Sequence, residues 1–200
     1  MKPGTIFVSH RAEYAALVRQ LKTAIQGTSR GKIKVFISED IVRGEKWRAA
    51  IENHLRESES LFLVYGAPYE DWSWCFYDAG YFAALCREQS APRDIFCISR
   101  PNIPAPGPLN DLQMLTDENQ LVEAVLNLYA RNGIEHDATA VRRCLGEMTK
   151  GLFGKLREFV SYPRVYFMAN DADFGPNNLI PPDSHLKLRR KTRYLTIYSA

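Results

Sequence analysis

The chain has 200 residues, 46% hydrophobic and 24% charged, as expected for one globular domain or for one domain and part of another. It contains no apolar run long enough to span a bilayer, and the strand-like segment that follows MKPG leaves no room for a secretory signal. The formal net charge is +3, but residues 187–193 hold five of the 26 basic groups, so 21 remain against 23 acidic ones and no nucleic-acid surface is indicated for residues 1–133.

Strand-like and helix-like segments alternate from residue 5 to residue 133. In chain order, we expect strands at 5–9, 34–38, 60–66, 94–99 and 111–115, with helices at 13–26, 47–59, 73–88 and 116–133 between and after them. The strands are continuous apolar runs, which indicates that both faces of the sheet are covered. The repetition predicts an α/β fold with a parallel sheet flanked by helices.

The rhythm of the sequence changes after residue 134. We expect one helix over 138–160, then PRVYFMA at 163–169 without an assigned element, a polar turn at 170–178, and a terminal strand within 193–200. The predicted organisation is therefore a first domain at 1–133, followed by a C-terminal extension or the start of a second domain at 134–200. The last predicted helix of the first domain has Thr116 as its expected N-cap and Gly133 as its stop. We also expect the chain to be part of a longer protein, because it ends on a strand-like run without a polar tail.

The cysteines and histidines predict neither disulfides nor a metal site. The four cysteines, at positions 75, 86, 97 and 144, form no CxxC pair and lie mostly in apolar segments, which favours reduced thiols in a cytoplasmic protein. The four histidines have no second ligand at metal-binding spacing. GTSRGKI lacks the spacing of a phosphate loop, NDADFGPNN lacks that of a calcium loop, and GxSxG, HExxH and GxGxxG are absent.

Three short motifs remain, each next to the carboxyl end of a predicted strand. They are IFVSH at 6–10, an I-x-x-G-x-x-W pattern at 41–47, and a W-C-x-x-D-x-G pattern at 74–80. Ligand sites of open parallel sheets lie at these strand ends. In this order and on these elements, the motifs resemble those of a Toll/interleukin receptor (TIR) domain of the bacterial type, over about residues 5–132. The resemblance implies a flavodoxin-like fold, with five parallel strands in the order 2-1-3-4-5.

The resemblance also implies an activity, since many TIR domains cleave NAD at the bond between nicotinamide and ribose. The family's catalytic acid is a glutamate four residues after a tryptophan, and the matching pair here is Trp74 and Asp78. Asp78 is one methylene, about 1.5 Å, shorter than a glutamate. In this interpretation Asp78 is catalytic, and Trp74, Ser9, His10 and Arg43 bind the substrate. NAD is the substrate, and no cofactor or metal is required.

Alternatives remain open from the sequence. The domain could instead be a TIR module that only self-associates, with the aspartate marking lost catalysis and the loop at 40–46 providing the contact. It could also be a related nucleoside-processing enzyme of the deoxyribosyltransferase kind. Asp78 could be a structural acid satisfied by Ser9 or Tyr65, and Trp47 is expected to anchor its helix in the core.

Overall fold

The structure is a computed structural model that describes residues 4–41, 46–66, 71–88, 92–101, 112–158, 164–166 and 196–198. Its main sheet has five strands in the order β2-β1-β3-β4-β5, and every neighbouring pair is parallel. The strands are β1 (Gly4–Ser9), β2 (Ile33–Phe36), β3 (Ser60–Val64), β4 (Asp94–Ile98) and β5 (Gln113–Leu115). The α/β class and the strand order predicted from the sequence are confirmed.

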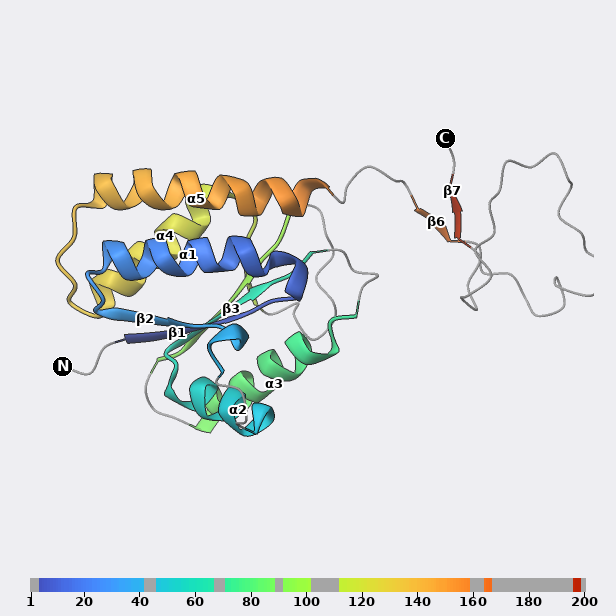
Figure 1. Cartoon of the computed structure of the whole chain (residues 1–200), viewed down its shortest axis with the longest axis horizontal. Helices are drawn as coiled ribbons and strands as arrows, with labels where there is room; N and C mark the ends of the chain where they lie inside the picture. The colour runs from blue at the N-terminus through green and yellow to red at the C-terminus, as the bar shows by residue number, and fades with distance from the viewer. Residues whose placement is uncertain are drawn as a thin grey trace, which may run out of the picture. The chain divides into compact units, whose positions relative to one another are not determined.

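Helices cover both faces of this sheet (Figure 1). On one face lie α1 (Ala15–Thr28), α4 (Glu118–Arg131) and α5 (Ala138–Glu158). On the other lie α2 (Trp47–Glu57) and α3 (Ser73–Glu88), which pack against each other. Short 3-10 turns at Ala12–Tyr14 (η1) and Ser38–Asp40 (η2) follow β1 and β2.

The core follows from this layering. All five residues of β3 are buried, because the strand is central and both of its faces are covered. The rings of Phe62 and Phe96 meet edge to face across β3 and β4, with centroids 5.1 Å apart. Leu21 and Ile25 of α1, which the helical spacing places on one stripe, are buried, and so is Val18.

The ends of α4 show one correct and one wrong prediction. The N-cap is Asp117 rather than Thr116, and its carboxylate accepts a hydrogen bond of 2.9 Å from the backbone N–H of Gln120. The predicted stop at Gly133 is confirmed, because this residue has a φ of +60° after the helix ends.

Helix α5 runs without a break through three glycines, as predicted, and belongs to the first compact unit, Met1–Arg157. Ion pairs join it to α4, between Arg142 and Glu123 and between Arg157 and Glu118. The compact unit thus extends beyond residue 133, the predicted end of the first domain. A compact unit need not coincide with a family domain, so the end of the TIR-like domain at residue 133 stays a prediction. None of the helices within the described ranges has the length and apolarity required to cross a membrane.

The second unit, Glu158–Ala200, contains a two-stranded antiparallel ladder. Its strands are β6 (Arg164–Tyr166) and β7 (Thr196–Tyr198), paired in register from Arg164 opposite Tyr198 to Tyr166 opposite Thr196. β7 lies within the terminal segment that the sequence predicts as a strand, whereas no strand was predicted where β6 lies. The basic residues 187–193 lie outside the described part of the chain.

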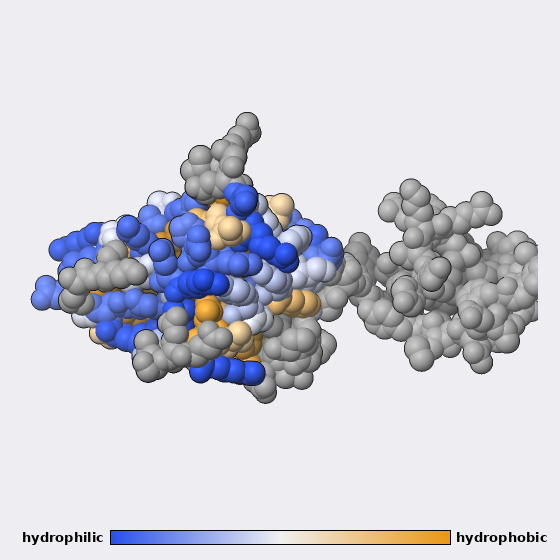
Figure 2. All heavy atoms as spheres, turned by 90° about the horizontal axis from the view of Figure 1, so that it is seen from below, coloured by the Kyte–Doolittle hydropathy of each residue, from blue (hydrophilic) through white to orange (hydrophobic). Residues whose placement is uncertain are grey.

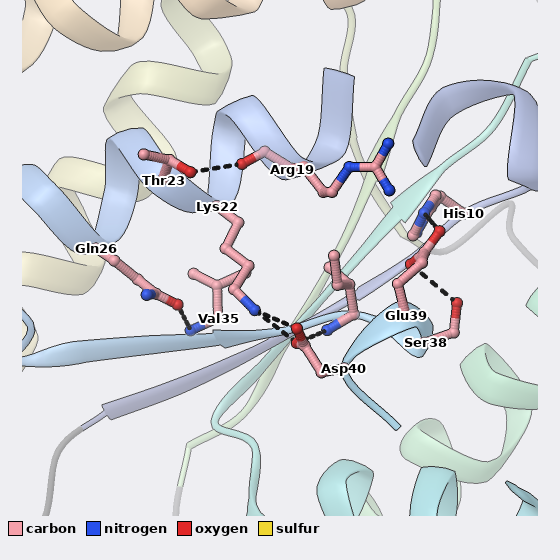
Figure 3. Close-up of polar contacts among 10 residues, drawn as sticks. His10, Arg19, Lys22, Thr23, Gln26, Val35, Ser38, Glu39 and Asp40 are labelled. Carbon is pink, nitrogen blue, oxygen red and sulfur yellow. Dashed lines mark hydrogen bonds and ion pairs between the residues drawn. The ribbon is translucent and has the colours of Figure 1, made fainter. Parts of the chain in front are cut away.

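Side chains from α1 hold the edge strand β2 (Figure 3). The side-chain carbonyl of Gln26 accepts a hydrogen bond of 3.0 Å from the backbone N–H of Val35, which satisfies a donor on the free edge of the sheet. Lys22 forms an ion pair with Asp40, with its Nζ 2.5 Å from Oδ1. The same carboxylate accepts a hydrogen bond from the backbone N–H of Ile37, so the end of β2 has a defined position.

Gly66, just after β3, allows a close approach to η1. A Cβ at this position would lie 2.0 Å from the hydroxyl oxygen of Tyr14, well inside van der Waals contact. A side chain at position 66 would therefore force Tyr14 or the chain after β3 to shift.

Candidate active site

The carboxylate of Asp78 lies in the first half of α3, on the side of the helix that faces the sheet. It is 7% exposed. Ser9, the last residue of β1, donates a hydrogen bond of 2.7 Å from its Oγ to Asp78 Oδ2. Asp78 Oδ1 is buried and has no hydrogen-bond partner within the described residues. A buried carboxylate oxygen without a donor is costly for stability, and this marks Asp78 as a candidate functional group.

The electrostatics of Asp78 follow from its burial. Desolvation raises the pKa of this carboxyl group to about 6, and the hydrogen bond from Ser9 opposes the rise. Asp78 is therefore mainly ionised at pH 7, although it is poorly solvated. Such a carboxylate interacts strongly with any positive charge or hydroxyl that reaches it.

Asp78 lies on a cavity of about 40 Å³ at the carboxyl ends of β1 and β2. The cavity is lined by Phe7, Val8, Ser9, His10, Ser38, Trp47, Ile51, Trp74, Cys75 and Asp78. A cavity of this volume holds a water molecule or a substrate hydroxyl. It is far smaller than the pockets of about 300 Å³ or more that bind whole ligands. The cavity therefore accepts a group of a substrate rather than a complete ring.

Two tryptophans stand at this cavity, and both are partly exposed. Trp74 is 53% exposed and Trp47 is 41% exposed. Their rings meet edge to face, with centroids 4.8 Å apart and an interplanar angle of 85°. The prediction that Trp47 anchors α2 in the core is wrong: Ile51 and Leu55 are the buried residues of that helix. The predicted proximity of Trp74 and Asp78, four residues apart on α3, is confirmed because both line the cavity.

Three polar and aromatic side chains that the sequence analysis missed extend this surface along α2 and α3. The guanidinium of Arg48 lies 5.8 Å from the ring centroid of Trp74 and 4.9 Å from that of Tyr77. Tyr77 donates a hydrogen bond of 2.6 Å to Glu52. Only the packing of α2 on α3 brings these residues together, although the three-residue spacing of Trp74 and Tyr77 indicates a shared helix face. The side of the molecule that carries α2 and α3 is largely hydrophilic, with small apolar patches (Figure 2).

His10 has a structural partner as well as a place on the cavity. Its side chain is 1% exposed, and its Nε2 lies 3.2 Å from Glu39 Oε1 (Figure 3). Its Nδ1 lies 3.3 Å from the carbonyl oxygen of Val8. Both ring nitrogens thus face oxygen acceptors, which fixes the orientation of the ring. Of the five predicted site residues, the cavity brings together Ser9, His10, Trp74 and Asp78. The fifth, Arg43, lies outside the described residues.

Cys75 was not predicted as part of the site, although it lies next to Trp74 in the sequence. It lines the cavity and is 5% exposed, and burial raises the pKa of its thiol to about 11. The thiol is therefore protonated at neutral pH and is a poor nucleophile there. Within the described residues, no group of three or more histidine, cysteine, aspartate or glutamate side chains is arranged to hold a metal ion.

Comparisons with known proteins identify the fold family. One solved structure similar to the chain is the TIR domain of the Toll-related receptor TRR-2 from Hydra magnipapillata; the match has 18% identity, covers 64% of this chain and 96% of that one, and has a TM-score of 0.41. Another comprises the TIR domains of the activated Roq1 resistosome, which directly recognises the pathogen effector XopQ. This match has 12% identity, covers 78% of this chain and 99% of that one, and has a TM-score of 0.42. No curated protein matches the sequence. A family model described as TIR domain matches residues 6–126, more than half of the chain. The chain therefore belongs to the TIR domain family.

Proposed function

We propose that this TIR domain cleaves NAD at the bond between nicotinamide and ribose. The observation that carries the proposal is the carboxylate of Asp78, with one oxygen held by Ser9 and the other buried without a partner in a small cavity beside exposed tryptophans. The family includes members that cleave NAD. The four-residue spacing of Trp74 and Asp78 resembles that of the family's catalytic tryptophan and glutamate, and this resemblance supports the proposal although the acid here is an aspartate.

The chemistry requires few groups. The C1′–N bond breaks with both of its electrons passing to the pyridinium nitrogen, so nicotinamide leaves as a neutral molecule and the ribose becomes oxocarbenium-like. A fixed carboxylate stabilises that positive charge, or holds a ribose hydroxyl so that the sugar is correctly placed. Water then adds to C1′ and releases a proton. No cofactor takes part, because the leaving group is already activated by its charge.

The described side chains fit these roles. The free oxygen of Asp78 and the size of the cavity suit one ribose hydroxyl or the edge of the sugar. The nicotinamide ring then lies outside the cavity, against the exposed indole of Trp74. Ser9 keeps the carboxylate oriented, and His10 contributes to the wall nearest the end of β2. Arg43 is proposed to contact the phosphates.

Nicotinamide release from NAD tests the proposal, measured on protein that is clustered artificially, since TIR domains commonly self-associate. Asp78→Ala removes the carboxylate and is expected to bring the rate to background. Asp78→Glu keeps the carboxylate and adds about 1.5 Å of reach, so it is expected to retain activity. Glu57→Gln changes an exposed carboxylate at the far end of α2 and serves as the matched control. Equal background rates for the wild type and Asp78→Ala would rule out the proposed reaction.

The second candidate function is that of a self-associating signalling module without catalysis. The exposure of two adjacent tryptophans favours it, because large aromatic side chains are enriched at protein interfaces. It predicts concentration-dependent self-association that Trp74→Ala weakens, with no nicotinamide released by any variant. Analytical ultracentrifugation and the release assay, performed on the same samples, separate the two candidates.

A further inference from the structure

We propose that the indole of Trp47 occupies the place against Trp74 that the flat ring of a ligand takes, so that Trp47 is an internal plug. A planar heteroaromatic ring must displace it before the attached sugar reaches Asp78. This inference deepens the proposed function and rests on it for the identity of the ring. The displacement itself has a test that does not depend on catalysis.

The geometry that supports the plug is a closed site with an unused functional group inside. Trp47 and Trp74 are in edge-to-face contact, and both line the cavity of about 40 Å³ that contains Asp78. The cavity is too small for a ring, yet the buried Oδ1 of Asp78 has no hydrogen-bond partner among the described residues. A hydroxyl can enter the cavity as it stands, but a ring that stacks on Trp74 while its sugar reaches this oxygen takes the side of Trp74 that Trp47 now contacts, so Trp47 has to move.

Of the two indoles, Trp47 makes fewer aromatic and cation–π contacts. It is the first residue of α2, and the N-cap residue, Lys46, makes no side-chain capping bond. Trp74 is its one aromatic partner in the described part of the chain. Trp74, in contrast, also contacts the ring of Tyr77, with centroids 6.0 Å apart, and lies under the guanidinium of Arg48. A rotation of Trp47 therefore breaks fewer aromatic and cation–π contacts than a rotation of Trp74, although Trp47 is the less exposed of the two, at 41% against 53%.

The surface that the plug covers suits a ring that carries positive charge. The guanidinium of Arg48 already lies near the faces of Trp74 and Tyr77, so a second cation is favoured there only where the charge of Arg48 is balanced. The charge of Arg48 is partly balanced by Glu52, whose carboxylate oxygen lies 3.9 Å from Arg48 Nε. Asp78 adds a second negative charge at the base of the cavity. A pyridinium ring joined to a sugar matches this arrangement.

Cys75 provides a probe of the plug, since its buried thiol lines the same cavity. In a background with Cys86→Ser and Cys144→Ser, a small thiol reagent modifies Cys75 only when the cavity opens. Removal of one edge-to-face aromatic contact in Trp47→Ala is expected to speed this modification about two- to twelvefold. Cys97, which is 0% exposed in β4 and away from the cavity, reports global unfolding and is expected to stay slow. Trp47→Phe keeps an aromatic contact and should behave like the parent.

The outcomes are distinct. An unchanged rate at Cys75 in Trp47→Ala overturns the plug, and so does an equal acceleration at Cys75 and Cys97, because Trp47 then acts on the whole fold. In the nicotinamide assay, a plug predicts that Trp47→Ala lowers KM by a similar factor with kcat unchanged, whereas a raised KM shows that Trp47 is a ligand-binding wall and overturns the plug. If no variant releases nicotinamide, the proposed function fails, and the thiol measurement still decides whether Trp47 closes the cavity.

Discussion

Replacement of Asp78 by asparagine is expected to stabilise the domain at neutral and alkaline pH. The side chain is 7% exposed, and its ionised form loses most of its hydration on folding. Asparagine has nearly the same shape and no charge, and its carbonyl oxygen can still accept the hydrogen bond from Ser9. The variant thus removes the desolvation cost that the site imposes on the fold.

The magnitude follows from the pKa of Asp78, which rises from its ordinary value of 3.8 to about 6 in the folded chain. A shift of this size corresponds to about 3 kcal/mol. Because the folded pKa is the higher one, the folded state binds the proton more tightly. The stabilisation that this proton provides is complete below pH 3.8 and is lost as the pH rises through about 6. The advantage of Asp78→Asn is therefore expected to grow by about 3 kcal/mol between pH 3.5 and pH 8.

Urea unfolding at a series of pH values measures this difference directly. Asp71→Asn is the opposite control, because hydrogen bonds from Ser73 lower the pKa of that exposed carboxyl group, so its contribution is lost as the pH falls. A stability difference between wild type and Asp78→Asn that stays constant over this pH range would refute the reasoning. It would mean that the carboxylate is hydrated in the folded state.

Three further expectations follow from single contacts. Ser9→Ala removes the hydrogen bond that lowers the pKa of Asp78, so the midpoint of the pH–activity curve for NAD cleavage should move to higher pH; an unchanged midpoint would mean that another group titrates. Gly66→Ala places a Cβ 2.0 Å from a tyrosine hydroxyl and should cost about 1–3 kcal/mol in urea unfolding, whereas Gly80→Ala, at an open position of α3, should add about 0.5–1 kcal/mol; equal effects would contradict the steric account. Asp117→Ala should cost about 1 kcal/mol through the lost N-cap of α4, and a larger loss from the same change at the preceding threonine would show that the cap is assigned wrongly.

The sheet and its helices could be predicted from the sequence because their signals are local. The apolar runs that became β1 and β3, and the 73–88 segment that became α3 with the same bounds, lie in continuous periodic stretches. The N-cap of α4 could not be chosen correctly, since Thr116 and Asp117 are adjacent and both suit the role. The attachment of α5 to the first unit depends on its ion pairs with α4 and on its close approach to Leu17 of α1, which no local pattern encodes.

The candidate site could be predicted in part. The family pattern located Asp78 and Trp74, and the rule for strand ends located Ser9 and His10; these four line one cavity. The exposure of Trp47 was not predictable, because a tryptophan at a helix start usually packs inward and only the tertiary structure sets it against Trp74.

Packing between helices also explains what the sequence analysis missed. Arg48 and Tyr77 are 29 positions apart in the sequence, and the contact of α2 with α3 brings the guanidinium of Arg48 to 4.9 Å from the ring centroid of Tyr77. The prediction of the fold therefore rests on the periodicity of apolar residues, and the prediction of the site rests on motif spacing. The closure of the site by Trp47 depends on contacts between helices that only the structure reveals.

The rate of nicotinamide release from NAD, followed from pH 4 to pH 8 on clustered protein, tests most directly whether the Asp78 carboxylate acts on the sugar. The account predicts a rate that rises with ionisation of a group of pKa about 6 in the wild type, and background at every pH for Asp78→Ala. A wild-type rate that equals the Asp78→Ala rate throughout would contradict it.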